Sequence, residues 1–76
     1  MVELVTYIVE QLVDDKSAVN VTSAEENGVE VVTIRVAEGD MGKVIGKQGK
    51  IAMAIRTLAK AVGIKNGKRY SIDIAD

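Results

Sequence analysis

Residues 44–51 read VIGKQGKI, and this stretch decides how the chain is interpreted. Gly46 and Gly49 enclose two polar residues, with an aliphatic pair before them and an apolar-periodic segment after them. Glycine lets the backbone turn sharply and lets another backbone come close, because it has no Cβ. Lysines at positions 47 and 50 add positive charge. A helix that begins near Gly49 would point its free N–H groups at the same opening, so the stretch favours contact with a phosphate group.

The spacing of the glycines separates this loop from two commoner phosphate-binding loops. A P-loop requires G-x-x-x-x-G-K-[ST], but Gly42 and Gly46 are one residue too close and Gln48 replaces the Ser or Thr. A dinucleotide-binding fingerprint requires G-x-G-x-x-G, and Val44 stands where its first glycine should be. The remaining pattern is G-x-x-G between two helices, which is typical of the backbone clamp of KH domains. An isolated match is more often a helix C-cap followed by a turn.

The surroundings of the loop favour the KH interpretation. The segment GKVIGKQGKIAMAIRTL, residues 42–58, closely resembles the KH signature. From LVTYIVEQLV through DMGKVIGKQGK to the last strand, the chain resembles the small single-KH bacterial RNA-binding proteins of the KhpA type. The resemblance covers essentially all of residues 1–76 and implies a single KH domain. One departure is that Ile51 is the first aliphatic residue after Gly49, which predicts a helix register shifted by one position.

Composition narrows the classes of function. The chain has no Cys and no His, which removes disulfides, thiolate metal sites and the usual general base. Because no carboxylate pair converges either, we expect no catalytic residue, no metal site, no cofactor and no enzyme activity. Tyr7 and Tyr70 are the only aromatic residues, which argues against folds that stack several bases on aromatic rings. No membrane-spanning run or signal peptide is visible, so a soluble cytoplasmic protein is expected.

Charge is distributed unevenly along the chain. Residues 1–40 contain two basic and nine acidic residues, a net charge of −7. Residues 41–76 contain eight basic and two acidic residues, a net charge of +6, so the chain as a whole carries −1. Such asymmetry indicates a charged partner for the second half, particularly because Lys43, Lys47 and Lys50 gather at the loop. The alternative is ordinary solvated charge spread around the fold.

The first half of the chain predicts a helix and a β-hairpin. Residues 2–14 place a double row of aliphatic residues on one helical face: Leu4, Val5, Ile8, Val9, Leu12 and Val13. Asn27-Gly28 is a strong hairpin signal, because both residues tolerate positive φ. Pairing outward from this turn sets Val21 against Ile34 and Val19 against Val36, all on one face. The opposite face carries Asn20, Thr22, Thr33 and Arg35. The sheet should therefore have one buried face and one wet face.

The second half predicts two helices and a strand. Asp40 is the expected N-cap of a short helix over 41–45, and a second helix runs from about 50 to 62, with Gly63 as its C′ residue. The apolar stripe of the second helix comprises Ile51, Ile55, Leu58 and Val62. Asn66-Gly67 is a predicted turn, and residues 70–74 alternate as a final strand.

The predicted order of elements, α-β-β-α-α-β, defines an α+β fold. A βααβ crossover makes the third strand parallel to the second if the two are neighbours. The family resemblance implies the type II KH fold, a three-stranded mixed sheet with helices packed on one face.

The resemblance also implies a mechanism and a set of RNA-binding residues. The loop would hold the backbone of single-stranded RNA, while the bases lie in an apolar groove between the two loop-linked helices and the sheet. Gln48 would donate to a phosphate oxygen, and Ala52 or Ala54 would extend the groove floor. The expected contacts are Lys43, Val44, Ile45, Gly46, Lys47, Gln48, Gly49 and Lys50. Burial of Val44 and Ile45 in the core, and a merely solvated role for Arg56 and Lys60, are the alternatives.

Two functions from different classes remain open. The favoured one is an RNA-binding module, for which we expect weak affinity and low sequence specificity. The other is a protein-interaction or dimerisation subunit in which RNA binding is secondary. Met53 on the second long helix, amid small side chains, predicts a homodimer through this helix. The resemblance implies pairing with itself or with a larger RNA-binding partner of the Jag/KhpB type. No membrane partner is expected.

Overall fold

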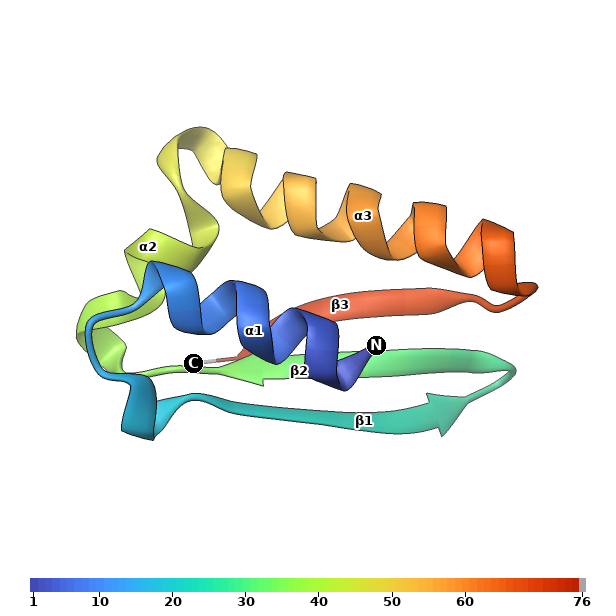
Figure 1. The fold of residues 1–76 in the computed structure, drawn as a ribbon, viewed down its shortest axis with the longest axis horizontal. Coiled ribbons are helices and arrows are strands. Elements are labelled where there is room, and N and C mark those ends of the chain that lie inside the picture. The colour runs from blue at the N-terminus through green and yellow to red at the C-terminus, as the bar shows by residue number, and fades with distance from the viewer. Residues whose placement is uncertain (76) are drawn as a thin grey trace.

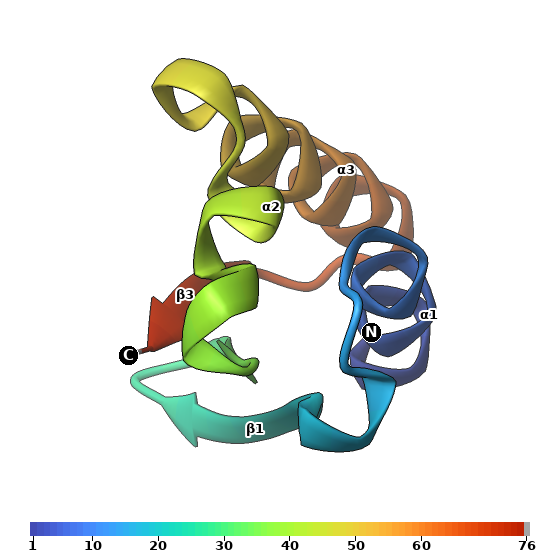
Figure 2. The same cartoon turned by 90° about the vertical axis from the view of Figure 1, so that its left-hand side faces the viewer.

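The computed structural model describes residues 1–75 and confirms the predicted order of elements (Figure 1). The helices and strands are α1 (Val2–Leu12), β1 (Asn20–Glu26), β2 (Val29–Arg35), α2 (Met41–Ile45), α3 (Lys50–Asn66) and β3 (Tyr70–Ala75). Short 3-10 turns cover Lys16–Ala18, Glu38–Asp40 and Lys47–Gly49. Figure 2 shows the helices on one side of the sheet, which leaves its other face open. The fold is the α+β architecture that the sequence predicted.

The sheet has the order β1-β2-β3, with β1 antiparallel to β2 and β2 parallel to β3. Asn27 and Gly28 adopt φ values of 54° and 81°, as a two-residue hairpin turn requires. Val21 pairs with Ile34, which confirms the predicted register. The predicted partners Val19 and Val36 lie one step beyond the last strand pair, and both pack against the core. The turn and the alternating pattern therefore set which face of the sheet is buried.

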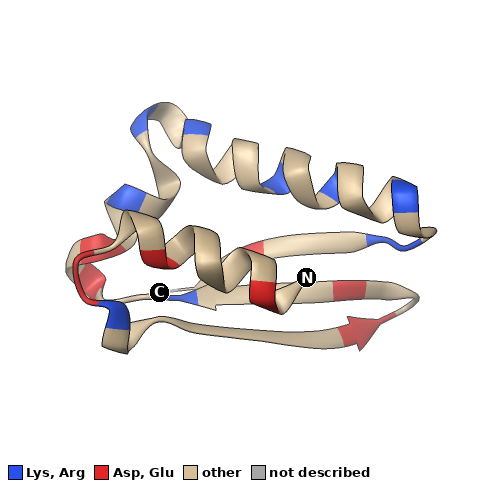
Figure 3. Cartoon of the chain, in the orientation of Figure 1, with Lys and Arg blue, Asp and Glu red and all other residues tan. Residues whose placement is uncertain are grey.

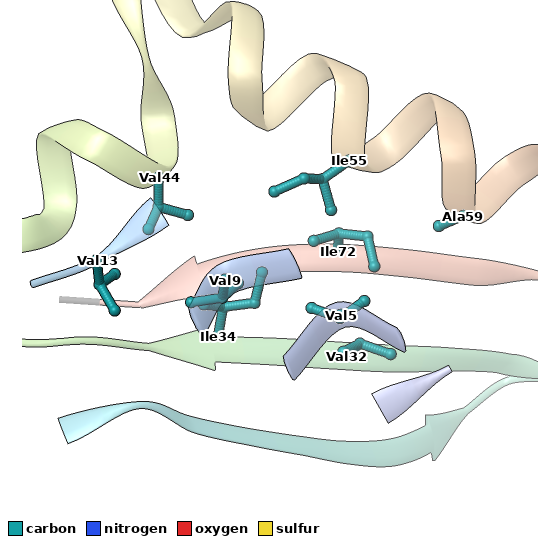
Figure 4. Close-up of a cluster of buried hydrophobic side chains, with 9 residues drawn as sticks. All are labelled: Val5, Val9, Val13, Val32, Ile34, Val44, Ile55, Ala59 and Ile72. Atoms are coloured by element: carbon teal, nitrogen blue, oxygen red, sulfur yellow. The ribbon is translucent and has the colours of Figure 1, made fainter. Parts of the chain in front are cut away.

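The core lies between this sheet and the helices (Figure 4). Its buried hydrophobic side chains are Val5, Val9, Val13, Val32, Ile34, Val44, Ile55, Ala59 and Ile72. Val5 and Val9 are one helical turn apart, so α1 presents both to the sheet. The predicted first helix ends earlier than expected, because Val13 is extended, with φ −95° and ψ 157°. Its side chain is nevertheless buried with the others.

Helix α3 is longer than predicted and does not end at Gly63. It continues to Asn66, and Gly67 terminates it in the left-handed conformation with φ 69°. The Lys68 N–H donates to the Gly63 carbonyl oxygen at 2.8 Å, a bond typical of a Schellman motif. Gly63 itself is buried inside the helix. The predicted turn at Asn66-Gly67 is therefore the helix cap, and Gly63 serves packing instead.

The buried face of α3 is made mainly of small residues. Ala52, Ile55, Ala59 and Gly63 are buried, whereas Leu58 of the predicted stripe is 40% exposed. A Cβ built on Gly63 would lie 2.5 Å from the Lys68 carbonyl oxygen and 3.2 Å from the Tyr70 ring. Small side chains let α3 approach β3 closely, so the helix turns these residues inward and leaves larger apolar ones outside. The predicted stripe was rotated by about one residue.

A buried carboxylate joins the segment after α1 to the start of α2. Asp40 is only 4% exposed, and its side chain accepts bonds from the Asp15 backbone N–H at 3.0 Å and from Lys43 Nζ at 3.3 Å. It occupies the predicted N-cap position of α2 but makes no capping bond there. The Asp15 N–H lowers the pKa of Asp40 below its usual value, and the nearby Lys43 adds to this shift, although burial opposes it.

Gly63→Ala should destabilise the protein, whereas Gly42→Ala should not, although both glycines lie within helices. The Cβ at Gly63 would force α3 away from β3, which we expect to cost about 1–3 kcal/mol. A Cβ at Gly42 meets no atom within 4 Å. Ala there should instead add about 0.5–1 kcal/mol of helix propensity. Urea denaturation of both variants checks this, and a Gly63→Ala protein as stable as the wild type would disprove the tight α3–β3 contact.

Asp40→Asn should lower the melting temperature at neutral pH. The difference in melting temperature from the wild type should become smaller as the pH falls. Because folding lowers the Asp40 pKa, the ionised carboxylate stabilises the fold above its unfolded pKa, about 3.9. This contribution disappears as the pH falls through the lowered native pKa. Melting curves of variant and wild type should therefore converge toward about pH 2. Asp73→Asn, at an exposed carboxyl of β3, is the control; a constant gap for Asp40→Asn would exclude the charge as its cause.

Candidate nucleic-acid interface

The turn between α2 and α3 depends on the backbone of Gly46. Its φ of 76° and ψ of 173° lie in a region that essentially only glycine occupies. A Cβ on Gly46 would also lie 2.6 Å from Ile51 Cγ1 and 2.9 Å from the Ile51 backbone nitrogen. Both conformation and space therefore exclude a side chain here. The fold therefore requires glycine at the first position of the motif.

The second glycine of the motif stands under a different constraint. Gln48 and Gly49 adopt left-handed conformations with φ 56° and 74°, and the Gly49 N–H donates to the Gly46 carbonyl oxygen at 3.1 Å. A Cβ on Gly49 would meet nothing within 4 Å. Gly49 precedes the 17-residue helix α3, and no side chain of residues 1–75 caps that N-terminus. The loop therefore presents open backbone and the positive end of a long helix.

Two lysines flank this opening without local partners. Lys47 and Lys50 are exposed, and neither forms an ion pair with any of residues 1–75. Figure 3 shows that basic residues continue along α3, whereas acidic residues gather on α1, the hairpin and the turns before α2. The charge asymmetry of the sequence is thus also an asymmetry in space. An anion at the loop meets uncompensated positive charge.

Lys43 is placed differently from the other predicted contacts. Its ammonium group donates to Asp14 and, at 3.3 Å, to Asp40. The hydrogen bond to Asp14 raises the Lys43 pKa above 10.5, and Asp40 adds to the rise against the effect of burial. Lys43 is therefore a cation between two carboxylates. Its main observed role is to hold the segment after α1 against α2.

The predicted groove floor is only partly accessible. Val44 has 0% exposure and belongs to the core, whereas Ile45 is 37% exposed. Ala52 is buried, and Ala54 is exposed on the outer side of α3. Val44 and Ile45 were predicted together as contacts, but a helix turns consecutive side chains by about 100°, so only Ile45 faces outward. Ile45 is the aliphatic residue available beside the loop.

Sequence reasoning missed a cleft at the other end of α3. Arg56 does not project freely into solvent, because its Nε donates to the Ile72 carbonyl oxygen of β3 at 3.2 Å. Together with Lys60 and residues of β3 it lines a cleft of about 560 Å³ between α3 and β3. The signal that could have revealed it is the absence of Asp and Glu from residues 41–72, which hold all eight cations of the second half.

The described residues offer neither a membrane anchor nor a metal centre. None of the described helices is long and apolar enough to cross a membrane. Within residues 1–75, no three His, Cys, Asp or Glu side chains converge in a way that could hold a metal ion.

Comparison with known proteins identifies the family of this chain. A family model described as "KhpA/KhpB, KH domain" matches residues 2–74. An RNA-binding protein KhpA from Treponema pallidum is 46% identical over 74 residues, which is 97% of this chain and 92% of the relative. The KhpA of Caldanaerobacter subterraneus is 49% identical over 74 residues, covering 97% and 99%. The KhpA of Listeria monocytogenes is 46% identical over all 76 residues of both chains.

No solved structure is significantly similar to the chain. The relatives named above are RNA-binding proteins. Because the family match covers nearly the whole sequence and the relatives align over almost their full length, the chain belongs to the KhpA/KhpB family of KH domains.

Proposed function

We propose that this chain is a single KH domain that binds single-stranded RNA through the loop 46–49 in the cytoplasm. The observation that carries the proposal is the loop geometry, in which Gly46 enforces the turn and Gly49 leaves the backbone open. A sugar–phosphate backbone can approach such a surface without meeting a side chain. The relatives are named RNA-binding proteins, which supports RNA as the ligand.

The chemistry of the clamp is electrostatic. A phosphate at the loop would meet the N–H groups at the start of α3, with Lys47 and Lys50 on either side and the Gln48 amide as a further donor. Two or three phosphate contacts give a slope of log K against log salt of about −1.4 to −2.1, since each contributes about −0.7 on single strands. The modest number of contacts makes the affinity weak. A clamp of this type holds about four nucleotides.

Replacing Lys47 and Gln48 together with Asp should reduce RNA affinity at least about tenfold, because two negative charges would stand where a phosphate lies. Both positions are exposed, and Asp tolerates the left-handed conformation of Gln48, so stability should change by no more than about 0.5 kcal/mol per site. Fluorescence anisotropy with a labelled single-stranded RNA measures the affinity, and thermal melting measures the stability.

The matched control for the clamp variant is Lys16→Asp with Asn20→Asp. It changes the net charge by the same amount at exposed positions on the other side of the fold. The control should retain most of the affinity. If the clamp variant binds as the wild type does, or no worse than this control, the loop is not the RNA contact.

A second candidate function is protein interaction through the outer face of α3. Lys50, Met53, Ala54, Thr57, Leu58 and Ala61 line a shallow, mostly apolar patch there. Met53 is 63% exposed and Leu58 is 40% exposed. The alanines beside them let another helix come close, and Met adapts to different contact surfaces. We propose a homodimer through this patch, which would present two weak RNA clamps together and raise the effective affinity.

Met53→Glu should convert the dimer to a monomer, because it places a charge at the centre of the patch. Ala61→Arg should act in the same way, whereas Ala59, which is 2% exposed, is buried in the core and cannot test the interface. Sedimentation at micromolar concentration should show a dimer for the wild type. Ile64→Glu is the matched control, since Ile64 is an exposed apolar residue of α3 outside the patch.

A wild-type protein that stays monomeric at the highest accessible concentration would contradict the homodimer. The alternative occupant is then a larger partner of the KhpB type, which the family description places in the same family. Co-purification of the two proteins, lost with Met53→Glu but kept with Ile64→Glu, would identify that occupant.

A further inference from the structure

The chain contains two Asn-Gly pairs, and the structure places both turns beside one hollow. Asn27-Gly28 forms the tip of the β1–β2 hairpin, and Asn66-Gly67 ends α3 (Figure 1). Gly28 and Gly67 both line this polar hollow, whose volume is about 310 Å³. Two carboxylates and two cations complete its lining: Glu25, Glu30, Lys68 and Arg69. The two turns therefore share the same solvent and the same balanced charge.

An Asn-Gly pair can react with itself. Once base removes the proton of the glycine amide, the amide nitrogen attacks the side-chain carbonyl carbon of the asparagine. A C–N bond forms and ammonia leaves. Water then opens the resulting five-membered imide to aspartate or isoaspartate, so one water is consumed for each ammonia released and no electrons are exchanged. Glycine favours the reaction because no Cβ shields the attacking nitrogen.

By sequence and by exposure the two pairs are equivalent. All four residues are exposed. Neither asparagine side chain makes a hydrogen bond within residues 1–75. Both glycines have positive φ, 81° at Gly28 and 69° at Gly67. Asn66-Gly67 is therefore an internal control for Asn27-Gly28, and a difference in their reactivity has to come from the backbone around them.

Backbone hydrogen bonds separate the two glycines. The Gly28 N–H donates to no acceptor within residues 1–75, so base reaches it in the folded protein. The Gly67 N–H donates to the Gly63 carbonyl oxygen, which also accepts from the Lys68 N–H at 2.8 Å. Removal of the Gly67 proton therefore requires that the C-cap of α3 opens first.

Ring closure also requires the backbone after the asparagine to rotate, and the two turns resist this rotation differently. At the hairpin tip the rotation loosens only the last strand pair, Glu26 with Val29, neither of which is buried. At the end of α3 it pulls Lys68 away from Gly63, which is buried and lies directly against the Tyr70 ring. The hairpin tip opens locally, whereas the cap of α3 opens only together with the α3–β3 contact.

We propose that Asn27 is a site of spontaneous deamidation and that the fold protects Asn66. The Gly28 nitrogen is the nucleophile, and water supplies the oxygen of the new carboxylate. The aspartate product keeps the turn, because Asp-Gly forms the same type of hairpin. The isoaspartate product lengthens the main chain of a two-residue turn by one carbon and so disturbs the β1–β2 register.

Both products add a negative charge to a hairpin tip that already carries Glu25 and Glu26. The tip lies at the end of the molecule opposite the loop 46–49 (Figure 1). Deamidation at Asn27 therefore weakens the hairpin and distinguishes aged copies of the protein from new ones. The inference does not depend on RNA binding.

Peptide mapping by mass spectrometry tests this on the wild-type protein. The folded protein is incubated at mildly alkaline pH, and the mass gain of deamidation is followed separately at the two asparagines. We expect Asn27 to convert at least about tenfold faster than Asn66, because two backbone hydrogen bonds must open at the cap of α3. In concentrated urea, which removes the fold, the two sites should convert at similar rates.

A pair of variants isolates each site in the intact protein. Asn27→Asp and Asn66→Asp each remove one reactive asparagine from an exposed turn and add the same charge. The folded Asn66→Asp protein should gain mass as fast as the wild type. The folded Asn27→Asp protein should gain mass at least about tenfold more slowly, because only the protected site remains.

Amide hydrogen exchange of the wild type measures the proposed cause directly, since it depends on removal of the same proton. The Gly28 amide should exchange faster than the Gly67 amide. A Gly28 amide as protected as that of Gly67 would overturn the proposal. So would conversion of Asn66 at least as fast as that of Asn27 in the folded protein, or a rate at Asn66 that urea does not raise.

Discussion

The loop between α2 and α3 can adopt its exposed turn only because Gly46 has no side chain. Its backbone conformation is closed to other residues, and the Ile51 side chain fills the space that a Cβ would need. This contact sets the angle at which α3 leaves α2. Because α2 is held through Val44 in the core, and α3 through Ile55, the short loop between them must stand out from the fold. The fold therefore produces an exposed, preorganised turn with little freedom to lose on binding.

Charge is divided between two tasks in this small chain. Carboxylates of the acidic first half form ion pairs that stabilise the fold: Asp14 and Asp40 hold Lys43 beside the end of α1. Apart from Lys43, the basic residues of the second half form no ion pair within residues 1–75, and basic residues follow α3 from the loop to its C-terminus (Figure 3). The net charge of −1 for the whole chain does not reveal that the two halves carry opposite charge. For an RNA-binding protein, the local potential at the site matters more than the total charge.

Those parts of the fold that depend on local chemistry could be predicted from the sequence. Asn27-Gly28 and the alternation around it determined the hairpin register, and the G-x-x-G pattern located the loop. The end of α3 could not be predicted, because Gly63 has the sequence signature of a C-cap while its actual role is a contact with Lys68 and Tyr70. That contact joins segments which only the folded topology brings together. The helical periodicity of the sequence carries no information about such long-range contacts.

The candidate site, too, could be predicted from the sequence only in part. Gly46 and Gly49 could be assigned from their spacing, but the sequence did not separate the two lysines free at the loop from Lys43, which meets carboxylates from another part of the chain. Arg56 is exposed, as a solvated role predicts, but the sequence does not reveal its hydrogen bond to a backbone carbonyl oxygen of β3. In each case the missing information concerned a long-range partner. Residue type and spacing identify which groups are present, and tertiary contacts decide which of them remain available.

The most direct test of the central claim is an NMR titration of the ¹⁵N-labelled protein with single-stranded RNA. The account predicts that the amide signals of Lys47, Gln48 and Gly49 shift first and most. Signals of Thr22 and Thr33, on the open face of the sheet, should stay in place. The contrary result is a set of shifts centred on that open face, with the loop amides unmoved at saturating RNA. It would show that the loop does not clamp RNA.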